Sequence, residues 1–78
     1  MSTMSVLDLQ CQEAMGAVEL TLAHMGYEDD DLIPATVLVE TTKQAAFAYT
    51  PIDAWECTVP YMLHWAYERF DLLVPRLN

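Results

Sequence analysis

The chain has 78 residues, of which 54% are hydrophobic, yet its twelve Asp and Glu side chains outnumber three Lys and Arg and give a net charge of −9. A charge this negative repels nucleic acid and anionic membranes and attracts basic protein surfaces. Three basic side chains are also too few to neutralise the phosphates that give a protein its affinity for nucleic acid. We therefore expect one small domain, residues 1–78, with neither a nucleic acid nor a membrane as its direct partner.

The first residues and the two cysteines, Cys11 and Cys57, bear on the compartment. Residues 1–9 lack the basic region of a signal peptide. No apolar run approaches the roughly 20 residues of a transmembrane helix. We therefore expect a cytoplasmic protein, in which thiols stay reduced.

The segment from Val6 to about Met25 predicts the first helix. Ser5 and Asp8 have the spacing of a capping box, and Gly26 is a residue type that ends helices in the left-handed conformation. Between them, apolar residues recur every three or four positions, as they do on one face of a helix: Leu7, Cys11, Ala14, Val18, Leu22 and Met25.

Residues 32–50 fit two structures. The β-branched residues of segment 36–42 are typical of a strand, and a hairpin over residues 36–50 would give an α+β fold. However, no Gly, Asn or Asp marks the turn that such a hairpin needs. A helix is favoured, with one face formed by Val37, Leu38, Thr41, Ala45, Ala48 and Tyr49.

The last third of the chain predicts two further helices. Thr50 and Asp53 have the spacing of a second capping box, with a proline at the first helical position, so a short helix is expected over residues 51–56. Thr58 and the proline at position 60 then predict a last helix from about Val59 to Leu73, ended by Pro75. Its core-facing residues would be Val59, Leu63, Ala66, Phe70 and Leu73.

Together these segments predict an all-α fold, a compact bundle of three to four short helices. The alternative is the α+β fold with the hairpin over residues 36–50.

No pattern in the sequence predicts a metal site or a cofactor site. Gly16 and Gly26 are too far apart for a phosphate-binding loop. Cys11 and His24 would lie about 20 Å apart along one helix, so they cannot share one zinc ion. We therefore expect no metal and no cofactor.

Catalysis is not predicted either. Cys57 and His64 are the one nucleophile pair to consider, and a reactive thiolate needs electropositive surroundings. Glu56 is the immediate neighbour of Cys57, and the whole chain is negative. We therefore expect a protein that is not an enzyme, with His64 and Glu68 as a solvent-facing pair.

The last helix has more apolar surface than one core can use. Its residues Tyr61, Trp65, Tyr67 and Leu72 fall outside the expected core face, and tyrosine and tryptophan are enriched at protein interfaces. We interpret these four residues as a partner-binding face. Acidic residues would form its rim: Glu28, Asp29, Asp30, Asp31 and Glu68.

The sequence thus predicts a small acidic protein-binding module. We expect an inhibitor or modulator of the phage or mobile-element type, which docks its aromatic face and acidic rim onto a basic-rimmed target protein. We also expect a homodimer, in which two copies bury each other's surplus apolar surface, and a homodimeric structural or adaptor protein is one alternative function. Another is a nucleic-acid mimic, whose carboxylates occupy the phosphate-binding site of a target.

Overall fold

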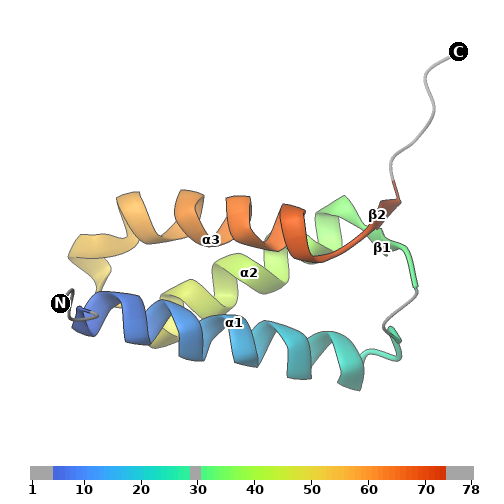
Figure 1. The fold of residues 1–78 in the computed structure, drawn as a ribbon, viewed down its shortest axis with the longest axis horizontal. Coiled ribbons are helices and arrows are strands. Elements are labelled where there is room, and N and C mark those ends of the chain that lie inside the picture. Colours follow the sequence, from blue (N-terminus) through green and yellow to red (C-terminus); the bar gives the residue numbers. More distant parts are fainter. Residues whose placement is uncertain (1–4, 29–30, 74–78) are drawn as a thin grey trace, which may run out of the picture.

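The computed structural model describes residues 5–28 and 31–73, which form a bundle of three α-helices (Figure 1). The expected all-α bundle is confirmed. The alternative hairpin over residues 36–50 is wrong, because residues 35–49 form one continuous helix. In chain order the elements are α1 (Val6–His24), β1 (Ile33–Pro34), α2 (Ala35–Tyr49), the single 3₁₀ turn η1 (Ile52–Ala54), α3 (Trp55–Arg69) and β2 (Leu72–Leu73).

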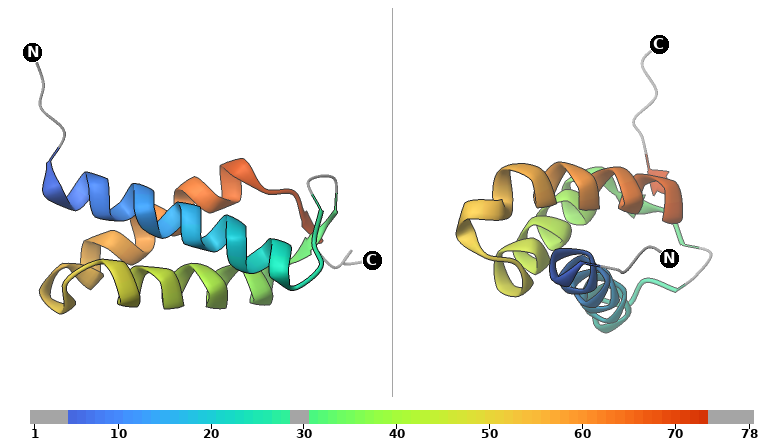
Figure 2. Two further views of the ribbon diagram at one scale, coloured as in Figure 1. Left: turned by 90° about the horizontal axis from the view of Figure 1, so that it is seen from below. Right: turned by 60° about the vertical axis from the view of Figure 1, so that its left-hand side comes forward.

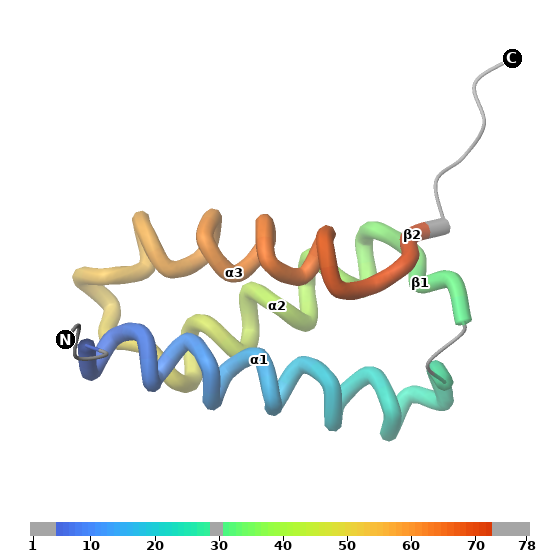
Figure 3. The backbone as a smooth tube through the Cα atoms, viewed as in Figure 1, coloured from blue at the N-terminus to red at the C-terminus, as the bar shows by residue number. Residues whose placement is uncertain are grey.

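The helices follow one another up, down and up along a molecule 45 Å long. Helix α2 runs antiparallel to both neighbours and packs closely against each, whereas α1 and α3 run parallel and contact each other less (Figures 2 and 3). Neither α1, α2 nor α3 is long and apolar enough to cross a membrane.

The start of α1 is the predicted capping box. The Asp8 amide donates to the Ser5 hydroxyl (3.1 Å), and the Ser5 amide donates to the Asp8 carboxylate (3.4 Å). These two bonds satisfy amides that have no partner within the helix, so α1 begins where the sequence predicts.

The end of α1 depends on Gly26, which has a φ of 97°. In this left-handed conformation the Gly26 amide donates to the Ala23 carbonyl (3.0 Å) and the Tyr27 amide donates to the Leu22 carbonyl (3.1 Å). This is a Schellman motif, which closes the last turn and redirects the chain toward β1.

The buried face of α2 differs from the predicted one. Thr42 and Ala46 are fully buried, whereas Ala48 and Tyr49 are exposed. Because α2 packs against both α1 and α3, its buried sector is displaced around the helix relative to the predicted face. Its buried residues are Leu38, Thr41, Thr42, Ala45 and Ala46.

The connection between α2 and α3 corrects the second predicted capping box. Thr50 does not cap a helix: its buried hydroxyl donates to the Ala46 carbonyl (2.6 Å) and bonds the Thr58 hydroxyl (3.1 Å). The Trp55 indole N–H donates to the Thr50 carbonyl (3.0 Å). These contacts fix the turn, so α3 begins at Trp55 rather than Val59.

Pro60 consequently lies inside α3, where the sequence predicted the first turn. A proline at this position removes the bond to the carbonyl four residues earlier, that of Glu56. The helix ends at Arg69, earlier than predicted, because Phe70 is extended and leads into β2. Strand β2 pairs with β1 in parallel, with Leu72 opposite Ile33. Pro75, the predicted stop, lies outside the described residues.

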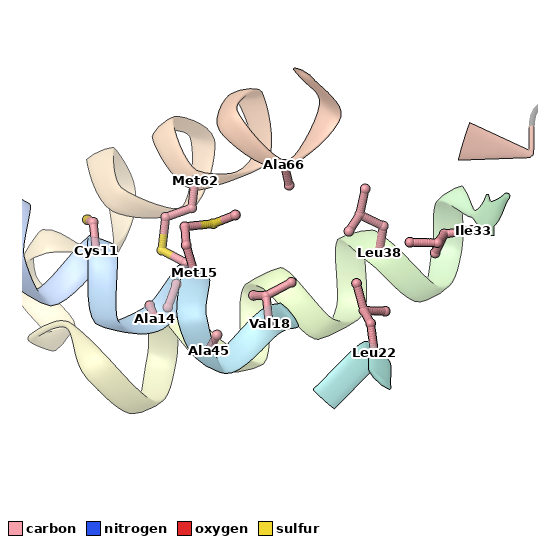
Figure 4. Packing of buried hydrophobic residues seen from close by; sticks show 11 residues of the cluster. Cys11, Ala14, Met15, Val18, Leu22, Ile33, Leu38, Ala45, Met62 and Ala66 are labelled. Carbon is pink, nitrogen blue, oxygen red and sulfur yellow. The ribbon is translucent and has the colours of Figure 1, made fainter. Parts of the chain in front are cut away.

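The hydrophobic core receives side chains from all three helices and from β1 (Figure 4). Met62 and Ala66 are the fully buried apolar residues of α3, and Leu63, which was predicted to be buried, is not part of the cluster. The buried face of α3 is therefore rotated from the predicted one, and it includes Thr58, whose hydroxyl bonds that of Thr50. The cluster consists of Cys11, Ala14, Met15, Val18, Leu22, Ile33, Leu38, Ala45, Ala46, Met62 and Ala66.

The two glycines offer a matched test of these backbone constraints. We expect Gly26→Ala to destabilise the fold by about 1–2 kcal/mol, because a Cβ is strained at positive φ. Gly16 is exposed within α1, and an added Cβ meets nothing within 4 Å, so Gly16→Ala is expected to stabilise by about 0.5–1 kcal/mol. Urea denaturation measures both changes in the free energy of unfolding. Equal effects of the two substitutions would contradict the different backbone roles of Gly26 and Gly16.

Two buried threonines give a second matched pair. The hydroxyl of Thr42 has no hydrogen-bond partner among the described residues, whereas that of Thr58 bonds Thr50. We expect Thr42→Val to raise the free energy of unfolding by about 1 kcal/mol, because it removes a buried polar group without a partner. Thr58→Val is expected to lower it by about 1 kcal/mol. Thermal and urea unfolding measure both changes in the free energy of unfolding. A loss of stability in both variants would contradict the expected difference between the Thr42 and Thr58 hydroxyls.

Candidate protein-binding site

Two of the predicted interface aromatics form a pair on α3. Tyr61 and Trp65 are one turn apart, and their ring centroids lie 6.0 Å from each other. Tyr61 is 51% exposed, whereas Trp65 is partly buried against the core. Glu68 lies a further turn along the same side of α3 and is exposed. The structure therefore brings together an aromatic pair and a carboxylate.

The other two predicted residues lie elsewhere. Tyr67 is exposed, but two positions beyond Trp65 correspond to a rotation of about 200° around a helix, so it projects from the opposite side of α3. Leu72 is in β2 and packs against the core. The four residues therefore do not form one continuous face.

The predicted acidic rim is divided in the same way. Glu28 and Asp31 are exposed in the connection after α1, where the Glu28 amide donates to the Asp31 carboxylate (2.7 Å). Asp29 and Asp30 lie outside the described residues. Glu68 is in the last turn of α3, where its carboxylate lies 3.3 Å from the His64 Nε2 on the exposed surface.

A cavity of about 350 Å³ opens beside Tyr61, between the first turns of α1 and α3. Its walls combine an aromatic ring, an aliphatic side chain, a carboxylate and two thiols. The lining residues are Leu7, Asp8 and Cys11 from α1, and Cys57, Thr58 and Tyr61 from α3. Sequence patterns did not reveal this cavity, because Asp8 was interpreted only as a helix cap and the pairing of α1 with α3 is a long-range contact.

The thiols in this cavity have different surroundings. Cys11 is 2% exposed, while Cys57 is open to solvent and its Sγ donates to the Ala54 carbonyl (3.1 Å). Burial raises the pKa of the Cys11 thiol, and the nearby charges of Asp8 and Cys57 raise it further. Cys11 is therefore held in the neutral form that a core position favours.

A second hollow lies between α1 and α2 and was also missed. Its volume is about 390 Å³, and small side chains such as Ala17, Ala45 and Ala48 line it. Exposed Met25 and Tyr49 also contribute to its walls. The sequence analysis placed Ala45 and Ala48 on one apolar face of a helix and did not single out Ala17, so the groove was not predicted.

Within residues 5–28 and 31–73, no group of three or more His, Cys, Asp or Glu side chains is arranged to hold a metal ion.

The basic Arg69 of α3 forms an ion pair with Glu19 of α1 at the far end of the seam between these helices.

Comparison with known proteins finds no matching family model, no matching curated protein and no matching solved structure.

The different burial of the paired aromatics predicts different effects of truncation. We expect Trp65→Ala to cost about 2–3 kcal/mol of stability, because its ring packs against the core. Tyr61→Ala is expected to cost less than about 1 kcal/mol, because half of this residue is exposed. Chemical denaturation followed by circular dichroism measures both values. A larger loss for Tyr61 than for Trp65 would contradict the assignment.

Proposed function

We propose that the protein binds another protein through a basic surface of that partner. The contact surface, which we term the aromatic–acidic site, consists of Tyr61, Trp65, Glu68 and the cavity that Leu7 and Asp8 line. The observation that carries this proposal is the exposed Tyr61, paired with the partly buried Trp65, beside a carboxylate-lined cavity in a chain of net charge −9. Aromatic side chains next to a pocket are typical anchors of protein interfaces.

The cavity has the chemistry to receive a lysine or arginine side chain of the partner. The aliphatic stem of such a residue can lie along Leu7, while its cation faces the ring of Tyr61 and the carboxylate of Asp8. One Asp8 oxygen accepts the Ser5 amide, and the other has no hydrogen-bond partner among the described residues. The volume of the cavity, about 350 Å³, is within the range of ligand pockets.

The charge distribution favours a basic partner over a second copy. The chain has three basic side chains, and one of them, Arg69, is already paired with Glu19. The resulting negative field accelerates the approach of a basic surface and repels an identical chain. We propose in addition that this binding makes the protein a cytoplasmic inhibitor or modulator of its partner. A homodimeric structural protein and a nucleic-acid mimic are the two alternative functions.

The test starts with the tagged chain as bait, and each captured protein is then purified and measured alone. We expect a one-to-one complex whose association rate falls at least about tenfold from low to high salt. Asp8→Asn combined with Glu68→Gln is expected to reduce that rate and its salt dependence. Tyr61→Ala is expected to raise the Kd about tenfold or more, since a truncated anchor costs over about 1.4 kcal/mol.

The matched control is Tyr67→Ala, which removes an equally exposed tyrosine from the opposite side of α3. It is expected to leave the Kd unchanged. Equal losses for the two tyrosine variants, or an association rate independent of salt, would contradict the proposed site. A dimer that light scattering detects at low micromolar concentration would favour the homodimer instead.

A further inference from the structure

The two cysteines, far apart in the sequence, line one cavity. Cys11 belongs to the second turn of α1 and Cys57 to the first turn of α3, and both contribute to the wall beside Asp8 and Tyr61. Their proximity also shows in their electrostatics, since the charge of Cys57 is among the causes that raise the pKa of Cys11.

Cys57 lacks the electropositive surroundings of a catalytic nucleophile, but exchange with a small disulfide depends on access as well as on thiolate formation. The two thiols differ in access in the way that a stepwise reaction requires. Cys57 is exposed, and its weak hydrogen bond to the Ala54 carbonyl leaves the sulfur within reach of solvent. Cys11 is buried at 2% exposure, so a reagent in solution reaches it only through the cavity. Access therefore favours Cys57 as the first residue to react and Cys11 as the second.

We propose that Cys57 and Cys11 form a dithiol site for low-molecular-weight disulfides such as oxidised glutathione, and that its reaction product is a disulfide between α1 and α3. This proposal uses the same cavity as the proposed partner binding, but its test needs only the chain and the small disulfide, so the two proposals can fail separately.

The reaction has two exchange steps. The Cys57 thiolate attacks one sulfur of oxidised glutathione, forms a mixed disulfide and releases one glutathione thiolate, which takes up the proton that Cys57 lost. Cys11, after losing its proton, then attacks the Cys57 sulfur and displaces the second glutathione thiolate, which takes up that proton. The two cysteine thiols are oxidised to one disulfide, and oxidised glutathione is reduced to two molecules of glutathione.

The product would link the two helices that contact each other least. Helices α1 and α3 both pack mainly on α2, so a covalent bond near their first turns adds a connection that the reduced fold has only weakly. A bond between residues 11 and 57 also closes more than half of the chain into a loop, which restricts the unfolded state. We therefore expect oxidation to raise the melting temperature by roughly 10 °C or more.

The test uses the full-length reduced protein incubated with oxidised glutathione, followed by alkylation of the remaining thiols and cleavage with trypsin. Lys43 is the sole basic residue between the two cysteines, so cleavage after it separates Cys11 from Cys57. The expected product is a pair of peptides, one ending at Lys43 and the other beginning at Gln44, joined by a bond that reduction breaks. Intact mass should show one chain that has lost two hydrogen atoms.

Two variants test the order of the steps. Cys11→Ser is expected to stop at the mixed disulfide of Cys57 with glutathione, and Cys57→Ser is expected to leave Cys11 reduced. Since Cys57 is exposed, the second variant keeps the core intact even if the first does not fold. The proposal is overturned if the wild-type chain stops at mixed disulfides, if the linked peptides come from two different chains, or if the melting temperature does not rise.

Discussion

Helix α2 packs against both other helices, and this central position constrains the whole fold. A helix with one neighbour needs one apolar stripe, but α2 must fit closely on two sides, and it does so with small side chains such as Thr42, Ala45 and Ala46 around the larger Leu38. Small residues let the helices approach closely, while several larger apolar side chains, such as Leu20 and Ile52, remain exposed.

The central place of α2 also explains where the hollow surfaces lie. Helices α1 and α3 are held in position mainly by their shared neighbour, so the seam between them is not filled along its whole length. One end of this seam contains the Glu19–Arg69 ion pair, and the other contains the cavity beside Tyr61. The candidate binding site and the dithiol site thus arise from the same incomplete contact.

Local signals predicted the first helix well and the third poorly. Helix α1 carries its own boundaries, because the Ser5–Asp8 box and the Gly26 turn involve residues close in the sequence. Helix α3 begins at Trp55 because Trp55 and Thr58 bond Thr50 from the preceding helix end. Those bonds depend on the turn already being folded, so the sequence around Thr58 and position 60 suggested a helix start that tertiary contacts override.

The residues of the candidate site could likewise be predicted only where local sequence signals determine them. Composition and helical spacing predicted surplus aromatic surface on α3. Of the predicted residues, Tyr61 is exposed, and the exposed Glu68 lies on the same side of the helix. Trp65 packs against the core because the buried face of α3 is formed by Thr58, Met62 and Ala66, and Leu72 does so because the helix ends at Arg69 and Leu72 lies in β2. The cavity itself needs Leu7 and Tyr61 from separate helices, and no single-segment pattern contains both.

The short parallel pairing of β1 with β2 has a consequence for the order of folding. It joins Ile33 to Leu72, so the chain between them, including all of α2 and α3, must already be compact before the two strands meet. Closing so long a loop costs entropy that neighbouring helices avoid when they form a local hairpin. We therefore expect the helical hairpins to form first and the pairing of β1 with β2 to form last. The pairing then fixes the end of α3 against the start of α2.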